Sequence, residues 1–162
     1  MQRFYEVLAA PRFREYLRRI GEYEAGRKFC RHDEQHLLDT ARLAWILVLE
    51  ERLGFSREMV YTAAFLHDIG RWCEYEEPQE DHAAASAVLA RPLLQEAGFS
   101  EAEIEVITAA IAEHRLPSLR CTTPLGRILA AADDLSRRCF ACAAAAECHK
   151  YRRMPARDKP VY

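Results

Sequence analysis

Apolar residues recur at helical spacing along almost the whole chain. Between residues 2 and 24, one apolar face is formed by Phe4, Leu8, Phe13, Leu17 and Ile20. Pro11 interrupts this pattern, because proline lacks the backbone N–H group that a helix interior needs. The segment therefore predicts an amphipathic helix that is broken at the proline.

Two further helices are predicted in the next part of the chain. Residues 34–53 repeat apolar positions at helical spacing, and Gly54 indicates the end of that helix. Ser56 is a suitable cap for the following helix, which is expected to continue to Gly70. The polar stretch WCEYEEPQED, residues 72–81, predicts a surface loop.

The second half of the chain carries three more helix signals. Residues 82–97 predict one helix, and the spacing of Ser100 and Glu103 is that of a capping box at the start of another. Thr123 is a suitable cap and Pro124 suits the first helical position, so a further helix is predicted to begin here. Because no strand-like alternation persists between these segments, the sequence predicts an all-α fold.

Composition and charge narrow the class of protein. The chain has 162 residues, half of them hydrophobic, and a net charge of -2, which fits one domain with a sizeable core. The absence of a basic surplus argues against nucleic acid as the main partner. No apolar run approaches the roughly 18 residues of a membrane span. Charges throughout the N-terminal segment argue against a signal peptide, so we expect a cytoplasmic protein.

Two histidines and two aspartates on separate predicted helices are the main candidates for chemistry. They are His36, His67, Asp68 and Asp133. Asp68 follows the apolar run AAFL, and a carboxylate that enters the interior unpaired is costly unless a metal compensates it. His32 is an alternative to His36. We favour His36 because it adjoins the apolar stripe of its helix. The plainer interpretation of His67 and Asp68 is a buried histidine beside a helix-terminal aspartate. The plainer interpretation of Asp133 is a solvent-facing carboxylate pair with Asp134.

Three segments in order carry a family resemblance. RHDEQHLLDTARLAWIL, AAFLHDIGR and RILAAADDLSR resemble the successive motifs of the HD-domain metal-dependent phosphohydrolase superfamily, over roughly residues 30–137. The resemblance implies a compact bundle of five or more helices around a buried metal, with His36, His67, Asp68 and Asp133 as the primary ligands. We expect a single HD domain over residues 1–162 with a C-terminal cysteine-containing segment, 138–162.

Two more histidines raise the question of a second metal ion. His82 and His114 resemble positions that bind a second ion in two-metal members such as the symmetrical diadenosine-tetraphosphate hydrolases, where Asp68 would bridge the ions. The alternatives are a surface residue at a helix start, a favourable charge at a helix C-terminus, or substrate contacts. Nitrogen and oxygen ligands suit iron, manganese, nickel, cobalt or zinc, and a histidine-rich pair of sites leans towards iron or manganese.

The resemblance implies hydrolysis of a nucleotide or another small phosphoester by a metal-activated water. His67 and Asp68 would act at the metal, while Arg71 and Arg115 are expected to contact phosphate, unless they form only surface salt bridges. Two alternatives remain open. One is a two-iron HD-type oxygenase, and the other is a non-catalytic module that senses a nucleotide or a redox state.

A second candidate metal site lies in the cysteines. Cys139, Cys142 and Cys148 form C-x2-C-x5-C, and x2 spacing is typical of a structural zinc site or an iron–sulfur cluster. Cys30 precedes His36 by six residues, and Cys139 follows Asp133 by six. If His36 and Asp133 meet at one metal on antiparallel helices, both cysteines lie towards the same end of the bundle. Cys30 is therefore the expected fourth ligand. Buried thiols acting as small hydrophobic side chains are the alternative.

The two remaining cysteines and the chain termini are less informative. Cys73 and Cys121 lie in predicted loops without an evident partner. The terminal helices, rich in tyrosine and phenylalanine, would suit a homodimer interface.

Overall fold

The computed structural model describes residues 1–162 and contains no β-strand. Its α-helices are α1 (Gln2–Ala9), α2 (Pro11–Glu24), α3 (Glu34–Glu50), α4 (Arg57–Leu66), α5 (Arg71–Glu76), α6 (His82–Glu96), α7 (Glu101–Glu113) and α8 (Pro124–Ser136). Short 3-10 helices follow at η1 (Ser118–Arg120), η2 (Cys139–Ala141), η3 (Ala145–Glu147) and η4 (Tyr151–Arg153). The predicted all-α fold is confirmed.

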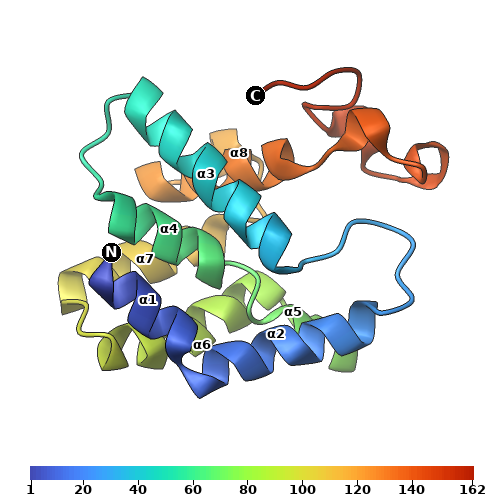
Figure 1. Ribbon diagram of the computed structural model, residues 1–162. Coiled ribbons are helices and arrows are strands. Elements are labelled where there is room, and N and C mark those ends of the chain that lie inside the picture. Colours follow the sequence, from blue (N-terminus) through green and yellow to red (C-terminus); the bar gives the residue numbers. More distant parts are fainter.

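The bundle is built around α3, α4, α7 and α8 (Figure 1). Helix α3 packs against both α4 and α8, and α7 packs against α4, α6 and α8. Helices α1 and α2 cover one side, where α1 contacts α4 and α6 and α2 contacts α5. The core between these helices contains fully buried Leu37, Leu66, Leu94, Ile107 and Leu129. Burial of these apolar side chains is the main source of the bundle's stability.

Several helix ends follow the local signals in the sequence. The break at Pro11 is confirmed, since α1 ends at Ala9 and the proline opens α2. Ser100 and Glu103 form the predicted capping box, with each side chain bonded to the other residue's backbone. The Thr123 side chain accepts a hydrogen bond from the Gly126 N–H at 3.1 Å and caps α8. Local chemistry alone determines these ends.

Two helices end earlier than predicted. Helix α3 stops at Glu50 instead of continuing to residue 53, because Arg52 adopts a left-handed φ of 54°. The Leu53 N–H then bonds back to the Val48 carbonyl at 3.0 Å, which closes the helix without a glycine. Helix α4 stops at Leu66, not at Gly70. His67 and Asp68 therefore lie in a turn beyond the helix end.

The predicted loop over residues 72–81 is wrong in its first half. Helix α5 covers Arg71–Glu76, and Cys73 lies in this helix and not in a loop. Arg71 and Glu74, three residues apart, form an ion pair at 3.0 Å, and the Tyr75 hydroxyl bonds to buried Glu24. Packing against α2 stabilises a helix whose polar composition resembles a loop.

The C-terminal segment, residues 138–162, contains no α-helix but only the turns η2, η3 and η4. The expected C-terminal helix is therefore absent, while the N-terminal pair is present. In Figure 1 this segment lies at the same end of the bundle as the loop between α2 and α3. None of the helices is both long and apolar enough to span a membrane.

Candidate metal centre

Three helices bring the primary candidates together at the middle of the bundle. His36 lies in the first turn of α3, His67 and Asp68 follow α4, and Asp133 lies in α8. The His36 Nε2 atom is 3.4 Å from Asp68 Oδ2 and 3.2 Å from Asp133 Oδ1. His67 Nε2 is 3.1 Å from Asp68 Oδ2. One potential ligand atom of each residue lies within 4.8 Å of all the others.

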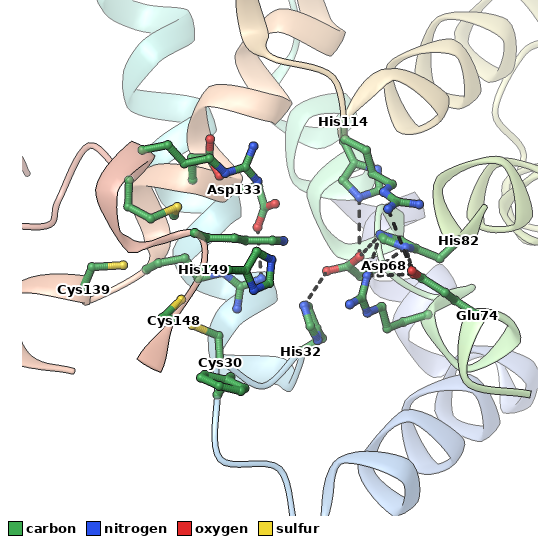
Figure 2. Close-up of a pocket in the computed structure, with 18 of the residues that line it drawn as sticks. Cys30, His32, Asp68, Glu74, His82, His114, Asp133, Cys139, Cys148 and His149 are labelled. Carbon is green, nitrogen blue, oxygen red and sulfur yellow. Dashed lines mark hydrogen bonds and ion pairs between the residues drawn. The ribbon is translucent and has the colours of Figure 1, made fainter. Parts of the chain in front are cut away.

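A second group of ligand atoms shares Asp68. His82, the first residue of α6, places Nε2 3.3 Å from Asp68 Oδ1. His114, which follows α7, places Nε2 3.5 Å from the same oxygen. Figure 2 shows both imidazoles directed at this carboxylate from the side opposite His32. The predicted convergence of His82 and His114 on the first group is therefore present in the fold.

The two oxygens of Asp68 face different groups of histidines. Oδ2 faces His36 and His67, while Oδ1 faces His82 and His114. The residue is only 2% exposed. Burial opposes its ionisation, yet the surrounding imidazoles, with His67 foremost, hold the pKa of the carboxyl well below its usual value. Asp68 is thus a buried anion placed to join two sites.

Backbone hydrogen bonds orient two of the imidazoles. His67 Nδ1 is 2.6 Å from the Ala64 carbonyl, and His114 Nδ1 is 2.8 Å from the Ile111 carbonyl. A carbonyl can only accept a hydrogen bond, so each Nδ1 carries the hydrogen and donates it, and each Nε2 presents a lone pair. His67 Nε2 is buried and has no hydrogen-bond partner. A divalent ion fits this donor set, because it would satisfy that atom and compensate the carboxylates.

His32 is also part of this centre, although His36 was the favoured candidate. Its Nε2 lies 3.9 Å from Asp68 Oδ2, and its Nδ1 pairs with the buried carboxylate of Glu24 at 2.5 Å. Burial lowers the pKa of His32 to about 4, although Asp68 and Glu24 act in the opposite direction. The spacing of four residues to His36 was the sequence signal for it.

Glu74 is a site residue that the sequence did not reveal, because its segment was predicted as a loop. Its carboxylate bonds to His82 Nδ1 and accepts from Arg71 Nη1 at 3.0 Å. A carboxylate in this position orients the imidazole so that Nε2 faces Asp68. Arg115 Nη2 lies 3.8 Å from Glu74, while its Nη1 pairs with Asp81 at 3.1 Å. Arg115 therefore reaches the centre through Glu74, whereas Arg71 also contacts His82 directly, with Nη1 2.8 Å from Nδ1.

Arg137 was also missed, although it follows Asp133 by four residues and so shares its helical face. Its Nη2 lies 3.2 Å from Asp133 Oδ1 and 2.9 Å from His36 Nε2. Burial opposes ionisation of Asp133, but Arg137 and His36 hold its pKa well below the usual value. The guanidinium thus places a positive charge at the edge of the first group.

A cavity of about 480 Å³ opens over Asp68 and Asp133 (Figure 2). Its cationic lining consists of Arg27, Arg71, Arg115, Arg137, Lys150 and Arg153. Burial and the neighbouring charge of Arg153 lower the pKa of Lys150, so these cations lie close enough to repel one another. Such a wall attracts an anionic ligand. Lys150 and Arg153 come from the C-terminal segment and carried no sequence signal.

The four cysteines of the second candidate site lie beside this cavity. We call them the cysteine quartet: Cys30, Cys139, Cys142 and Cys148. Cys30, Cys139 and Cys148 line the main cavity, and Cys142 lines an adjoining one. Groups of three or more potential ligand atoms within 4.8 Å of one another include no cysteine. The fold thus brings the quartet to two neighbouring cavities without a group of three closely spaced sulfurs.

Comparison with known proteins agrees with this geometry. The HD domain family profile matches residues 34–138. An uncharacterized protein of Clostridium beijerinckii is 38% identical over 149 residues, which covers 92% of each chain. The crystal structure of a predicted HD superfamily hydrolase from an uncultured Thermotogales bacterium has a TM-score of 0.58 at 30% identity, covering 77% of this chain and 68% of that one. The profile match includes every member of both ligand groups and excludes all four members of the cysteine quartet.

Proposed function

Because this chain belongs to the HD-domain phosphohydrolase superfamily, we propose that it is a two-metal hydrolase of a small phosphoester, with nucleotides as the favoured class. One observation carries the two-metal proposal: the oxygens of buried Asp68 face two separate groups of imidazoles. A carboxylate shared in this way is the usual means of holding two ions a few ångströms apart.

The proposed ligands divide between the two ions. His36, His67 and Asp133 would hold the first ion, His82 and His114 the second, and Asp68 both. Bound divalent ions would acidify water and neutralise charge on phosphoryl oxygens. The protein itself positions the imidazoles, since Nδ1 of His67 is held by the backbone and Nδ1 of His82 by a carboxylate. The nitrogen-rich ligand set favours iron or manganese, with zinc, nickel and cobalt as further candidates.

The cationic lining of the cavity favours an anionic substrate. Phosphoryl transfer depends on positioning and charge stabilisation more than on covalent catalysis. Arg71 lies beside the second ligand group and Arg137 beside the first, so a phosphate between the ions would meet a guanidinium on each side. A cavity of about 480 Å³ is within the range of small-molecule sites. This arrangement favours a phosphoester over a neutral substrate of an oxygenase.

The proposal is tested by phosphate release from a panel of nucleotides, dinucleoside polyphosphates and simple phosphomonoesters. Metal-free protein would be assayed with manganese, iron, zinc, nickel and cobalt in turn. Metal-dependent release from at least one substrate class is the expected result. Protein that binds two ions yet hydrolyses nothing, or that consumes oxygen instead, would overturn the proposal.

The two ligand groups should be separable by mutation. We expect His114→Ala to lower bound Mn²⁺ from about two ions per chain to about one, because only the second group loses a ligand. His36→Ala should remove the other ion. His149→Ala is the matched control, because this histidine lines the cavity but belongs to neither group. Equilibrium dialysis against Mn²⁺ measures the count, and unchanged binding in both variants would contradict the two-group assignment.

The C-terminal cations should contribute to substrate binding. We expect the double variant Lys150→Ala, Arg153→Ala to raise KM about tenfold, equivalent to ~1.4 kcal/mol, because the phosphate loses two cationic neighbours. The rate constant kcat should change little, since neither residue belongs to a ligand group. Arg152→Ala is the matched control, because Arg152 lies in the same turn but does not line the cavity. Equal KM values in the two variants would exclude this role.

A further inference from the structure

The cysteine quartet joins two segments that are distant in sequence. Cys30 lies in the loop between α2 and α3, and the other three lie in the C-terminal segment. All four are free thiols. Figure 2 shows Cys30, Cys139 and Cys148 on one side of the cavity. The six-residue offsets predicted from His36 and Asp133 therefore do bring Cys30 and Cys139 to the same end of the bundle.

The four thiols lie along two neighbouring cavities. Cys30 and Cys139 line both the main cavity and the adjoining cavity of about 400 Å³, while Cys148 lines only the main cavity and Cys142 only the adjoining one. Burial, together with the smaller effect of the three other thiols nearby, raises the pKa of Cys139 to about 11. Cys139 itself is buried and the other three are half-buried. Four converging thiols at a protected position are a typical metal-ligand set.

We propose that the cysteine quartet binds one 4Fe–4S cluster. A tetrahedral zinc ion, with zinc–sulfur bonds of about 2.3 Å, would require sulfurs only about 3.8 Å apart. No three of these sulfurs approach within 4.8 Å of one another. In a 4Fe–4S cluster each thiolate binds a different iron, so the four sulfurs enclose a larger volume. The absence of three closely spaced sulfurs, and the two neighbouring cavities that share Cys30 and Cys139, fit the cluster better than the single ion.

The surroundings suit the negative charge that four thiolates bring. Arg137 and Lys28 line the adjoining cavity beside Cys30. Arg27 lines the main cavity, and its Nε donates to the Cys30 carbonyl at 2.9 Å, which holds the ligand loop in place. Cationic neighbours and hydrogen bonds of this kind stabilise iron–sulfur clusters and tune their potentials.

The cluster would hold the C-terminal segment in place. This segment has only 3-10 turns and buries few side chains, yet it supplies Lys150 and Arg153 to the cavity wall. Its ion pair with the α2–α3 loop, between Lys28 and Glu147, is exposed, and the hydrogen bond of 2.9 Å to the Arg31 carbonyl comes from Arg137, just before the segment. Exposed ion pairs contribute little. Cluster ligation across the two segments would fix the C-terminal segment to the α2–α3 loop.

Acid-labile sulfide tests the proposal, because the histidine and aspartate ligands bind no sulfide. Protein purified under anaerobic conditions, or reconstituted with iron and sulfide, should contain about four acid-labile sulfides per chain and show iron–sulfur absorption. Cys142→Ala and Cys148→Ala should each lose the sulfide while Mn²⁺ binding at the Asp68 centre persists. Cys73→Ala and Cys121→Ala are matched controls outside the quartet and should retain it.

If a variant fails to fold, the acid-labile sulfide content of the wild-type protein alone tests the cluster assignment. About one zinc per chain without sulfide, or sulfide retained in all four variants, would overturn the proposal. A dependent expectation, which rests on the proposed function, is that Cys142→Ala raises KM for the phosphoester by about tenfold, as loss of Lys150 and Arg153 does. Failure of hydrolysis with sulfide present would count against the function and leave the cluster assignment standing.

Discussion

Asp68→Asn is expected to abolish hydrolysis and to release both metal ions. Asparagine keeps the size of the side chain but offers one neutral oxygen in place of two anionic ones. Bound Mn²⁺ should fall from about two ions per chain to less than one. Turnover should fall by at least about a thousandfold, since metal stabilisation of the transition state is worth several kcal/mol and each 1.36 kcal/mol is a factor of ten.

The loss must be separated from unfolding. Asp68 is ionised within a group of imidazoles, so Asn and Ala variants are compared with the wild type by circular dichroism and thermal melting in the absence of metal. Asp39→Asn is the matched control, because Asp39 lies on α3 near His36 and pairs only with Arg42, at 3.6 Å, and with Gln35. This control should keep metal binding and turnover. A folded Asp68→Asn protein with wild-type turnover would remove Asp68 from the mechanism.

Gly70→Ala is expected to destabilise the protein by about 3 kcal/mol, the upper end of the cost of overpacking. A Cβ atom at Gly70 would lie 2.5 Å from the Ser86 backbone nitrogen and 2.9 Å from the Ala85 carbonyl carbon. Backbone atoms cannot rotate away as a flexible side chain would. The hydrogen bond of 2.8 Å from the Gly70 N–H to Ser86 Oγ would also be strained. Chemical denaturation measures the loss, and the melting temperature should fall by roughly 6–12 °C.

Gly21→Ala is the control for this prediction. Gly21 lies inside α2, where a Cβ atom would meet nothing within 4 Å. Alanine has the higher helix propensity, so this variant should gain up to about 1 kcal/mol of stability. Since Gly70 follows Asp68 by two residues, Gly70→Ala should also weaken Mn²⁺ binding. Equal stability of the two variants would show that the α4–α5 turn does not require the close approach to α6.

The helices were largely predictable because their signals are local. The break at Pro11 and the capping box at Ser100 each depend on residues within one turn of the chain. Helix α5 was not predictable for the opposite reason. Its polar sequence forms a helix because Tyr75 reaches Glu24 of α2, a contact between residues far apart in sequence.

The primary ligand candidates were recognisable as separate residues. His36, His67, Asp68 and Asp133 lie in ordered motifs, and the residues themselves favoured a site near the apolar stripes. The supporting residues were not recognisable in the same way. Glu74 orients His82 from a segment predicted as a loop, and Glu24 holds His32 from α2. No motif in the sequence links these pairs.

The sequence by itself determined the helical class, the identity of the possible ligands and the C-x2-C-x5-C spacing, because periodicity, caps and side-chain chemistry are properties of short segments. Only the tertiary structure decided that Asp68 turns one oxygen to each group of histidines. It also decided that Lys150 and Arg153 line the cavity over Asp68 and Asp133. These features depend on the packing of distant helices, which brings charged and ligating atoms together across sequence separations that local patterns do not encode.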